Sequence, residues 1–167
     1  TIINCAGIFD KVEPNPKCWV YPDAHGGLNV VNALEVSCNS FFYEVGYDLG
    51  LDENGEYSSD LGVKRIKKYA EEFGLGETTG IEIPESSPQI SDTASVPTAI
   101  GQGTNNYTVS QLNRYVATVA NKGTVYKLSL LDKVTDIDGN VVKEYEPEVV
   151  NTMDDVSTNT WNLVHQG

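Results

Sequence analysis

Apolar residues recur at the three- and four-residue spacing of an α-helix in five stretches of the chain. The first two stretches are adjacent, and the tripeptide Ser37-Cys38-Asn39 interrupts the apolar spacing between them. In the fourth stretch, Thr108 and Gln111 have the spacing of a capping box, which marks the start of a helix. The pattern predicts helices at about residues 30–36, 40–49, 61–73, 109–121 and 155–166. The apolar stripe of the fourth helix consists of Leu112, Tyr115, Val116 and Val119.

The segments between the predicted helices follow other patterns. Residues 1–28 contain prolines and paired glycines that break any regular period, so we expect irregular structure there. β-Branched residues on both sides of Asp138-Gly139 predict a β-hairpin at about residues 124–145. We expect residues 85–98 to form a loop and residues 147–153 to form a linker. A majority of helices with one hairpin indicates an α/β (α+β) fold class.

Composition and charge exclude several classes of protein. With 167 residues, 40% apolar and 21% charged, the chain can bury a core and fits one domain or a large piece of one. The net charge of −13 argues against nucleic acid as a partner, because phosphate binding needs clustered Lys and Arg. No run of about 18 apolar residues is present, so we expect no membrane segment in this chain.

The cysteines and histidines leave one question open. Cys5 and Cys18 flank a loop short enough to be closed by a disulfide, but two ordinary thiols fit the sequence equally well, and the odd count leaves Cys38 unpaired. There is no Cys-x-x-Cys pair, and His25 and His165 lie far apart, so we expect no metal site and no cofactor. His25 either lines a site or packs beside the adjacent glycine turn.

Ser37 and Asn39 are the first candidates for chemistry. A hydroxyl and a carboxamide two residues apart, at a break between helices, can point into one groove while Cys38 points away from it. A second Ser-x-Asn sequence begins at Ser157, but that serine is placed to cap the last predicted helix. The copy at residues 37–39 is therefore the candidate site.

Several further segments accompany this motif in a fixed order. They are Ile3-Asn4-Cys5-Ala6-Gly7, Lys17-Cys18-Trp19, His25-Gly26, residues 33–44, residues 73–84, Ile100-Gly101-Gln102-Gly103, Thr108-Val109-Ser110-Gln111-Leu112 and Asn121-Lys122-Gly123-Thr124. In order and spacing they resemble the middle of the transpeptidase domain of a class B penicillin-binding protein. The resemblance implies the penicillin-binding protein/β-lactamase-like transpeptidase fold, here mostly its helical lobe with one β-hairpin.

The resemblance also implies roles for individual residues. In that family, the serine of a Ser-x-x-Lys motif attacks the D-Ala-D-Ala amide of a peptidoglycan stem peptide, and β-lactams acylate the same serine. Ser37 would relay a proton between two lysines of the site, and Asn39 would hydrogen-bond the substrate backbone. Gln102 and Gly103 would border the substrate groove. The parent protein would act at the extracytoplasmic face of the cell membrane, anchored by an N-terminal helix outside this chain.

Two motifs of the family are missing from the sequence. No serine has a lysine three residues after it, and no Lys-Thr-Gly or Lys-Ser-Gly is present. We therefore expect the chain to be a fragment of a serine-type D,D-transpeptidase that lies between these motifs. Such a fragment would be catalytically inactive by itself.

Other functions fit the same residues. A serine β-lactamase or a penicillin-sensor domain of the same superfamily also uses Ser-x-Asn, although Ile100-Gly101-Gln102-Gly103 before a Thr-capped helix favours the penicillin-binding protein. A non-catalytic scaffolding domain that has lost the site is a third possibility. The flanking gene sequence would distinguish an enzyme, which needs Ser-x-x-Lys and Lys-Thr/Ser-Gly, from a scaffold.

Overall fold

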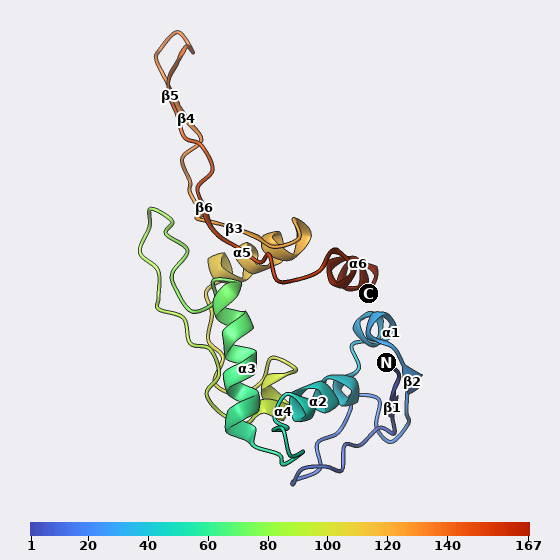
Figure 1. The fold of residues 1–167 in the computed structure, drawn as a ribbon. Coiled ribbons are helices and arrows are strands. Elements are labelled where there is room, and N and C mark those ends of the chain that lie inside the picture. The colour runs from blue at the N-terminus through green and yellow to red at the C-terminus, as the bar shows by residue number, and fades with distance from the viewer. The chain divides into compact units, whose positions relative to one another are not determined.

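The computed structural model describes residues 1–167, which pack as two compact units. Unit 1 comprises residues 1–69, 90–105 and 156–167, and unit 2 comprises residues 70–89 and 106–155. The elements, labelled in Figure 1, are β1 (Ile3–Cys5), β2 (Gly26–Leu28), α1 (Val30–Glu35), α2 (Asn39–Asp48), α3 (Ser59–Glu72), α4 (Ser95–Thr98), α5 (Val109–Ala120), β3 (Thr124–Tyr126), β4 (Lys133–Thr135), β5 (Val141–Glu144), β6 (Val149–Thr152) and α6 (Thr158–Gln166). No helix combines the length and the apolar character needed to cross a membrane.

Unit 1 is built around α1 and α2. The strands β1 and β2 pair antiparallel, with Ile3 opposite Leu28, and pack beside these helices. α6 packs against α1, and α4 packs against α2. The contact of α4 with α2 is close, because a Cβ at Gly46 would lie 2.8 Å from the carbonyl oxygen of Ser95. The main core cluster of the unit consists of Cys5, Cys18, Ala33, Cys38 and Phe41, each at most 5% exposed.

The strand pair β1–β2 and the helix α4 correct two expectations from the sequence. Residues 1–28 are not wholly irregular, since both strands lie within them, and the expected loop at residues 85–98 contains α4. These elements have only three or four residues each. An element of this length is too short to show an apolar period in the sequence. It can be recognised only from the element it packs against or pairs with in the fold.

Unit 2 contains α5 and a long β-ribbon. β4 pairs antiparallel with β5 across the turn at Gly139, and β3 pairs antiparallel with β6 (Figure 1). The ribbon therefore extends further than the hairpin predicted at residues 124–145, and β6 occupies residues that we had expected to form a linker. All four residues of β6 are exposed, so the strand lacks the alternation that would have identified it.

The burial of α5 is the reverse of what its apolar stripe suggests. Gln111, Arg114 and Thr118 are at most 2% exposed, whereas Leu112 and Val116 of the stripe are 45% and 61% exposed. The polar face is buried because it makes hydrogen bonds to other segments: Gln111 donates to the carbonyl of Glu77, and Arg114 donates to the carbonyls of Gly74 and Thr78. Tyr115, also in the stripe, packs edge-on against Phe73. Hydrogen bonds thus contribute much of what fixes α5 in its unit.

Glu85 is at the centre of a second hydrogen-bond network in unit 2. Its carboxylate accepts hydrogen bonds from the backbone N–H and hydroxyl of Thr79, at 2.7 and 2.8 Å, and from the hydroxyl of Ser110 at 2.7 Å. Burial acts to raise the pKa of Glu85, but the hydrogen bonds from Ser110 and Thr79 outweigh it and lower the pKa below its usual value. The nearby Arg114 cation also favours the ionised carboxylate.

This shift predicts an acid-dependent loss of stability. Because the pKa is lowered in the folded protein, the stabilisation by Glu85 is present above the ordinary carboxyl pKa and disappears as pH falls through the folded-state value. We expect Glu85→Gln to lower Tm at pH 7 by about 3 °C. The difference from wild type should shrink below about pH 4. Thermal unfolding of both proteins, followed by circular dichroism from pH 3 to 7, measures this difference in Tm. A constant difference over that range would contradict the lowered pKa of Glu85.

Candidate functional site

The loop between α1 and α2 holds the Ser-x-Asn sequence. Asn29 caps α1 by accepting a hydrogen bond from the backbone N–H of Asn32 at 2.9 Å. After the last turn of α1, Ser37 adopts a positive φ of 51°, a conformation that is uncommon for residues other than glycine. The backbone N–H of Cys38 then donates to the carbonyl of Ala33 at 2.9 Å. This turn ends α1 and allows α2 to begin at Asn39.

The indole of Trp19 fixes the backbone of this loop. Its Nε1–H donates to the carbonyl oxygens of Val36, at 3.1 Å, and Ser37, at 3.0 Å. Two acceptors that the helix end leaves without an intrahelical partner are thereby satisfied. Trp19 itself is 62% exposed, so its packing contributes less than these hydrogen bonds to its position.

Burial varies along the tripeptide. Ser37 is exposed and Asn39 is half-buried, whereas Cys38 between them is fully buried in the core of unit 1. This burial pattern is compatible with the predicted arrangement, in which the middle residue points away from the other two. The chemical roles of Ser37 and Asn39 remain predictions.

Gln102 and Gly103 lie in the turn after α4. The backbone N–H of Gln102 donates to the carbonyl of Pro97 at 3.1 Å, and its own carbonyl accepts from the side chain of Asn105 at 3.1 Å. Gly103 has φ of 91°, and a Cβ there would lie only 2.7 Å from the hydroxyl of Thr93, so glycine is required at this position. The turn therefore has a fixed backbone, and the side chain of Gln102 is exposed.

α2 connects this turn with Asn39. α4 meets α2 at Gly46, which lies about 10 Å along the helix from Asn39. Gln102 and Asn39 thus belong to the same unit. That their side chains border one groove stays a prediction.

Behind the Ser-x-Asn loop, four side chains with metal-binding chemistry come together. They are Cys5 in β1, Cys18, His25 and Cys38, and their ligand atoms all lie within 4.8 Å of one another. His25 Nδ1 is 3.6 Å from the Sγ of Cys5 and 3.7 Å from the Sγ of Cys18. The Sγ atoms of Cys18 and Cys38 are 4.0 Å apart. All three cysteines are free, so of the two alternatives for Cys5 and Cys18 the structure has the thiols.

The thiols of this cluster differ in acidity. Burial acts to raise the pKa of Cys5, but hydrogen bonds from the backbone of His25 and the side chain of Ser40 outweigh it and lower the pKa to about 6. Burial, together with the neighbouring Cys5 and Cys18, raises the pKa of Cys38 to about 12. The thiol of Cys5 is thus readily ionised, whereas the neighbouring thiol of Cys38 is not.

No direct signal of this cluster is present in the sequence. Its members are spread over residues 5–38, and no two of them have the short spacing of a known metal motif. The expectation of no metal site was drawn from that spacing and from the distance between the two histidines. Only the pairing of β1 with β2 and the turn before α2 bring the four residues together. The position of Cys38 between Ser37 and Asn39 was the one available clue.

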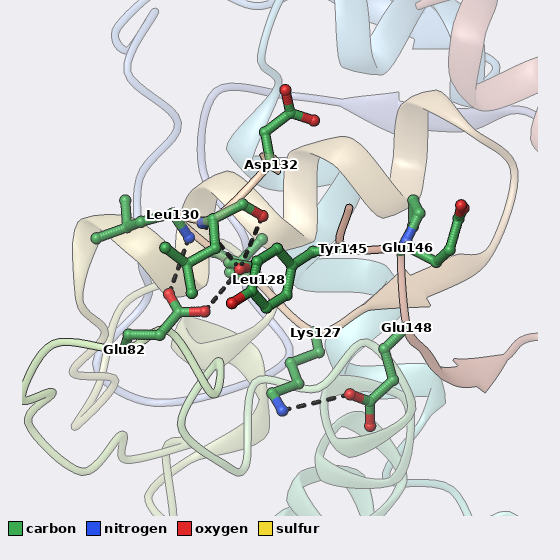
Figure 2. A pocket seen from close by; sticks show the side chains of 11 residues that line it. Glu82, Lys127, Leu128, Leu130, Asp132, Tyr145, Glu146 and Glu148 are labelled. Atoms are coloured by element: carbon green, nitrogen blue, oxygen red, sulfur yellow. Dashed lines mark hydrogen bonds and ion pairs between the residues drawn. The ribbon is translucent and has the colours of Figure 1, made fainter. Parts of the chain in front are cut away.

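A separate hollow of about 550 Å³ lies in unit 2 beside the β-ribbon (Figure 2). The carboxylate of Glu82 accepts hydrogen bonds there from the hydroxyl of Ser129, at 2.6 Å, and the backbone N–H of Leu130, at 2.8 Å. Lys127 pairs with Glu148 at 3.3 Å. None of the site residues predicted from the sequence lines this hollow. Four of its polar side chains, those of Glu82, Lys127, Ser129 and Glu148, are thus engaged in contacts that link the ribbon to its surroundings or its two strands to each other.

Comparison with known proteins assigns the fold and the family. A family model described as the penicillin binding protein transpeptidase domain matches residues 4–167. The chain belongs to this family. As the motifs predicted, it is part of the transpeptidase domain of a class B penicillin-binding protein, with an α+β penicillin-binding protein/β-lactamase-like fold.

Individual relatives agree with this assignment. The chain is 29% identical over 160 residues to the peptidoglycan D,D-transpeptidase MrdA of Escherichia coli, covering 86% of this chain and 23% of the relative. It is 32% identical over 146 residues to penicillin-binding protein 2A of Bacillus subtilis, covering 77% of this chain and 20% of the relative. The chain therefore spans about a quarter or less of the length of these relatives.

Solved structures of penicillin-binding proteins have the same fold. Penicillin-binding protein 2B of Streptococcus pneumoniae matches with a TM-score of 0.76 and 21% identity, over 99% of this chain and 29% of that one. Penicillin-binding protein PBP2 of Helicobacter pylori matches with a TM-score of 0.72 and 17% identity, over 99% of this chain and 29% of that one.

Proposed function

We propose that this chain is part of a peptidoglycan D,D-transpeptidase that cross-links stem peptides through an acyl-serine intermediate. The observation that carries the proposal is the geometry of residues 37–39. An exposed hydroxyl and a half-buried carboxamide flank a buried residue, at a turn whose backbone is held by Trp19. Membership of the transpeptidase family gives this geometry its chemical interpretation.

Each side chain has a role that its chemistry allows. The hydroxyl of Ser37 both donates and accepts a hydrogen bond, so it can pass a proton between two basic groups during acyl transfer. The carboxamide of Asn39 can donate to a substrate carbonyl and accept from a substrate N–H. Gln102 and Gly103 border the substrate on another side.

The substrate, inhibitors and location follow from the same proposal. The D-Ala-D-Ala end of a stem peptide is the substrate, and β-lactams acylate the nucleophile in its place. The complete protein acts at the extracytoplasmic face of the cell membrane and is anchored by an N-terminal helix. The proposed acyl-serine chemistry of the complete protein needs no cofactor.

The nucleophile is assigned to residues beyond this chain. Each of its serines lacks a lysine three residues on, and none of its lysines begins a Lys-Thr-Gly or Lys-Ser-Gly sequence. A polypeptide of residues 1–167 alone is therefore expected not to form an acyl-enzyme. The turn at Gln102, followed by a capping box that starts α5, favours the transpeptidase over a β-lactamase of the same fold.

Labelling with a fluorescent penicillin tests the proposal. The full-length protein should retain about one label per molecule after denaturation, as expected for an acyl-serine intermediate, and unlabelled penicillin added first should prevent it. Residues 1–167 alone should retain none. A stoichiometric label on the isolated chain would contradict the assignment of the nucleophile. An unlabelled, folded full-length protein would favour a scaffolding function.

A further inference from the structure

The turn at Gln102 and Gly103 rests on a network of buried hydroxyl groups. The hydroxyl of Ser91, which is 1% exposed, accepts a hydrogen bond from the backbone N–H of Thr104 at 3.3 Å and lies 2.8 Å from the hydroxyl of Thr98. A Cβ at Gly103 would overlap the Ser91 hydroxyl, so the backbone of the turn packs directly against this side chain. Because Thr98 belongs to α4, Ser91 joins the turn to that helix.

Asn105 ties the same turn to the backbone of Ser91. Its carboxamide nitrogen donates to the carbonyl of Gln102 at 3.1 Å, and its carboxamide oxygen accepts from the backbone N–H of Ser91 at 2.8 Å. A carboxamide can make both bonds because it carries a donor and an acceptor. One side chain therefore bridges the turn and the segment that leads into α4.

The helix α4 is itself fixed by two other segments of unit 1. Ser95 of α4 is fully buried, and its backbone N–H donates to the hydroxyl of Ser59 at 3.1 Å. α4 also contacts α2 at Gly46, where no side chain would fit. α2 begins at Asn39. The turn that carries Gln102 is thus connected to Asn39 through hydrogen-bonded or closely packed elements of one unit.

Stability of the core accounts for only part of this network. Buried hydroxyls need partners, and the pair formed by Ser91 and Thr98 would satisfy each other without the turn. The remaining bonds hold residues 102–104, all of which are exposed. An exposed turn buries little apolar surface, so its fixed backbone contributes little to the hydrophobic stabilisation of the unit. A loop held in place by a rigid scaffold is typical of a binding surface.

We propose that Ser91 and Asn105 are positioning residues for substrate binding. They act through the turn, by holding Gln102 in a fixed place relative to Asn39. This inference rests on the proposed function, in which Asn39 and Gln102 contact the stem peptide or the β-lactam that replaces it. Acylation requires the bound molecule to be held within about 0.5 Å of its productive position, so a turn that moves freely would slow the reaction.

Acylation kinetics of the full-length protein test the inference. Gln102→Ala is expected to slow acylation by a fluorescent penicillin roughly tenfold, and Ser91→Ala and Asn105→Ala at least roughly fivefold each. The decisive measurement is the double variant. In the Gln102→Ala background, Asn105→Ala should slow acylation further by less than about twofold, because the side chain that it positions is absent.

Asn121→Ala is the matched control. The carboxamide of Asn121 makes the same pair of bonds around its own turn in unit 2, to the carbonyl and the backbone N–H of Thr124, both at 2.7 Å. Its removal should leave acylation unchanged, although it deletes as many hydrogen bonds as Asn105→Ala does.

The outcomes separate this inference from the proposed function. Normal acylation by Asn105→Ala, or equal slowing by it in both backgrounds, would overturn the positioning role and leave Gln102 at the substrate. Normal acylation by Gln102→Ala would overturn the role of Gln102 and the inference with it. A full-length protein that folds but takes no label would overturn both the inference and the proposed function.

Hydrogen exchange in the unmutated protein covers variants that fail to fold. The amides of Gln102 and Thr104 donate to the carbonyl of Pro97 and the hydroxyl of Ser91. They should exchange at least roughly a hundredfold more slowly than in an unstructured chain before any penicillin is added, and acylation should change their rates by less than about threefold. Unprotected amides that become protected only in the acylated protein would show that the ligand orders the turn, and would overturn positioning by the network.

Discussion

Replacing Ser37 by alanine in the full-length protein is expected to slow acylation by a penicillin by about 10²–10⁴-fold. The substitution removes the hydroxyl proposed to relay the proton, and an alanine methyl group can neither donate nor accept one. Fold and backbone should be retained, because serine and alanine tolerate the positive φ at this position about equally poorly. The second-order rate constant, from stopped-flow or gel-based labelling, measures the loss.

Two further variants separate chemistry from stability. Ser37→Gly relieves the strained φ and also lacks the hydroxyl, so it should acylate as slowly as Ser37→Ala while being at least as stable. Ser157→Ala is the matched control in the second Ser-x-Asn sequence. Ser157 caps α6 by accepting a hydrogen bond from the backbone N–H of Thr160 at 3.1 Å. Losing this cap should lower the free energy of unfolding by about 1 kcal/mol and leave acylation unchanged. Normal acylation by Ser37→Gly would exclude the relay.

Arg114→Met is expected to lower the free energy of unfolding by about 2–4 kcal/mol, because it removes the donors for several backbone carbonyls at once. The guanidinium of Arg114 is 2% exposed and donates to the carbonyls of Gly74, Glu77 and Thr78. Burial lowers the pKa of Arg114, and the charges of Glu77 and Glu85 oppose that shift. Methionine fills a similar volume but satisfies none of these acceptors.

The measurement for Arg114→Met must report on unit 2. Both tryptophans, Trp19 and Trp161, lie in unit 1, so their fluorescence does not follow the unit that contains Arg114. Urea unfolding should therefore be followed by circular dichroism, with fluorescence as a second signal that shows whether the units unfold together. Lys64→Met, at an exposed position, is the control for the change in charge. A loss within about 0.5 kcal/mol for Arg114→Met would show that hydrophobic contacts compensate for the hydrogen bonds.

Local sequence signals identified the helices correctly where a cap or a long apolar period was present. The capping box at Thr108 and Gln111 and the caps at Asn29 and Ser157 have the predicted hydrogen bonds. These features could be predicted because each depends on residues within one turn of helix. The strands β1, β2 and β6 could not be predicted in this way, because a strand of three or four residues is recognised only by the strand with which it pairs.

The orientation of α5 and the metal-binding cluster required long-range information. The apolar stripe of α5 predicted a buried face, but Arg114 finds its acceptors around Gly74, far away in sequence, and these bury the polar face instead. Similarly, Cys5 and Cys38 become neighbours only through the fold of unit 1. The burial of Cys38 between the more accessible Ser37 and Asn39, in contrast, fits the spacing of these neighbouring residues at a helix break.

The packing of α6 against α1 has a consequence for the order in which unit 1 folds. Trp161 in α6 is buried, and Gly167 at the end of this segment lies close to Val31 and Leu34 of α1. This contact joins segments separated by most of the chain, so forming it requires closure of a long loop, which is entropically costly and slow. The contacts among residues 5–38 are much more local and can form earlier. The helix that leads into Ser37 would thus receive its final support late, after the turn that carries the motif has already formed.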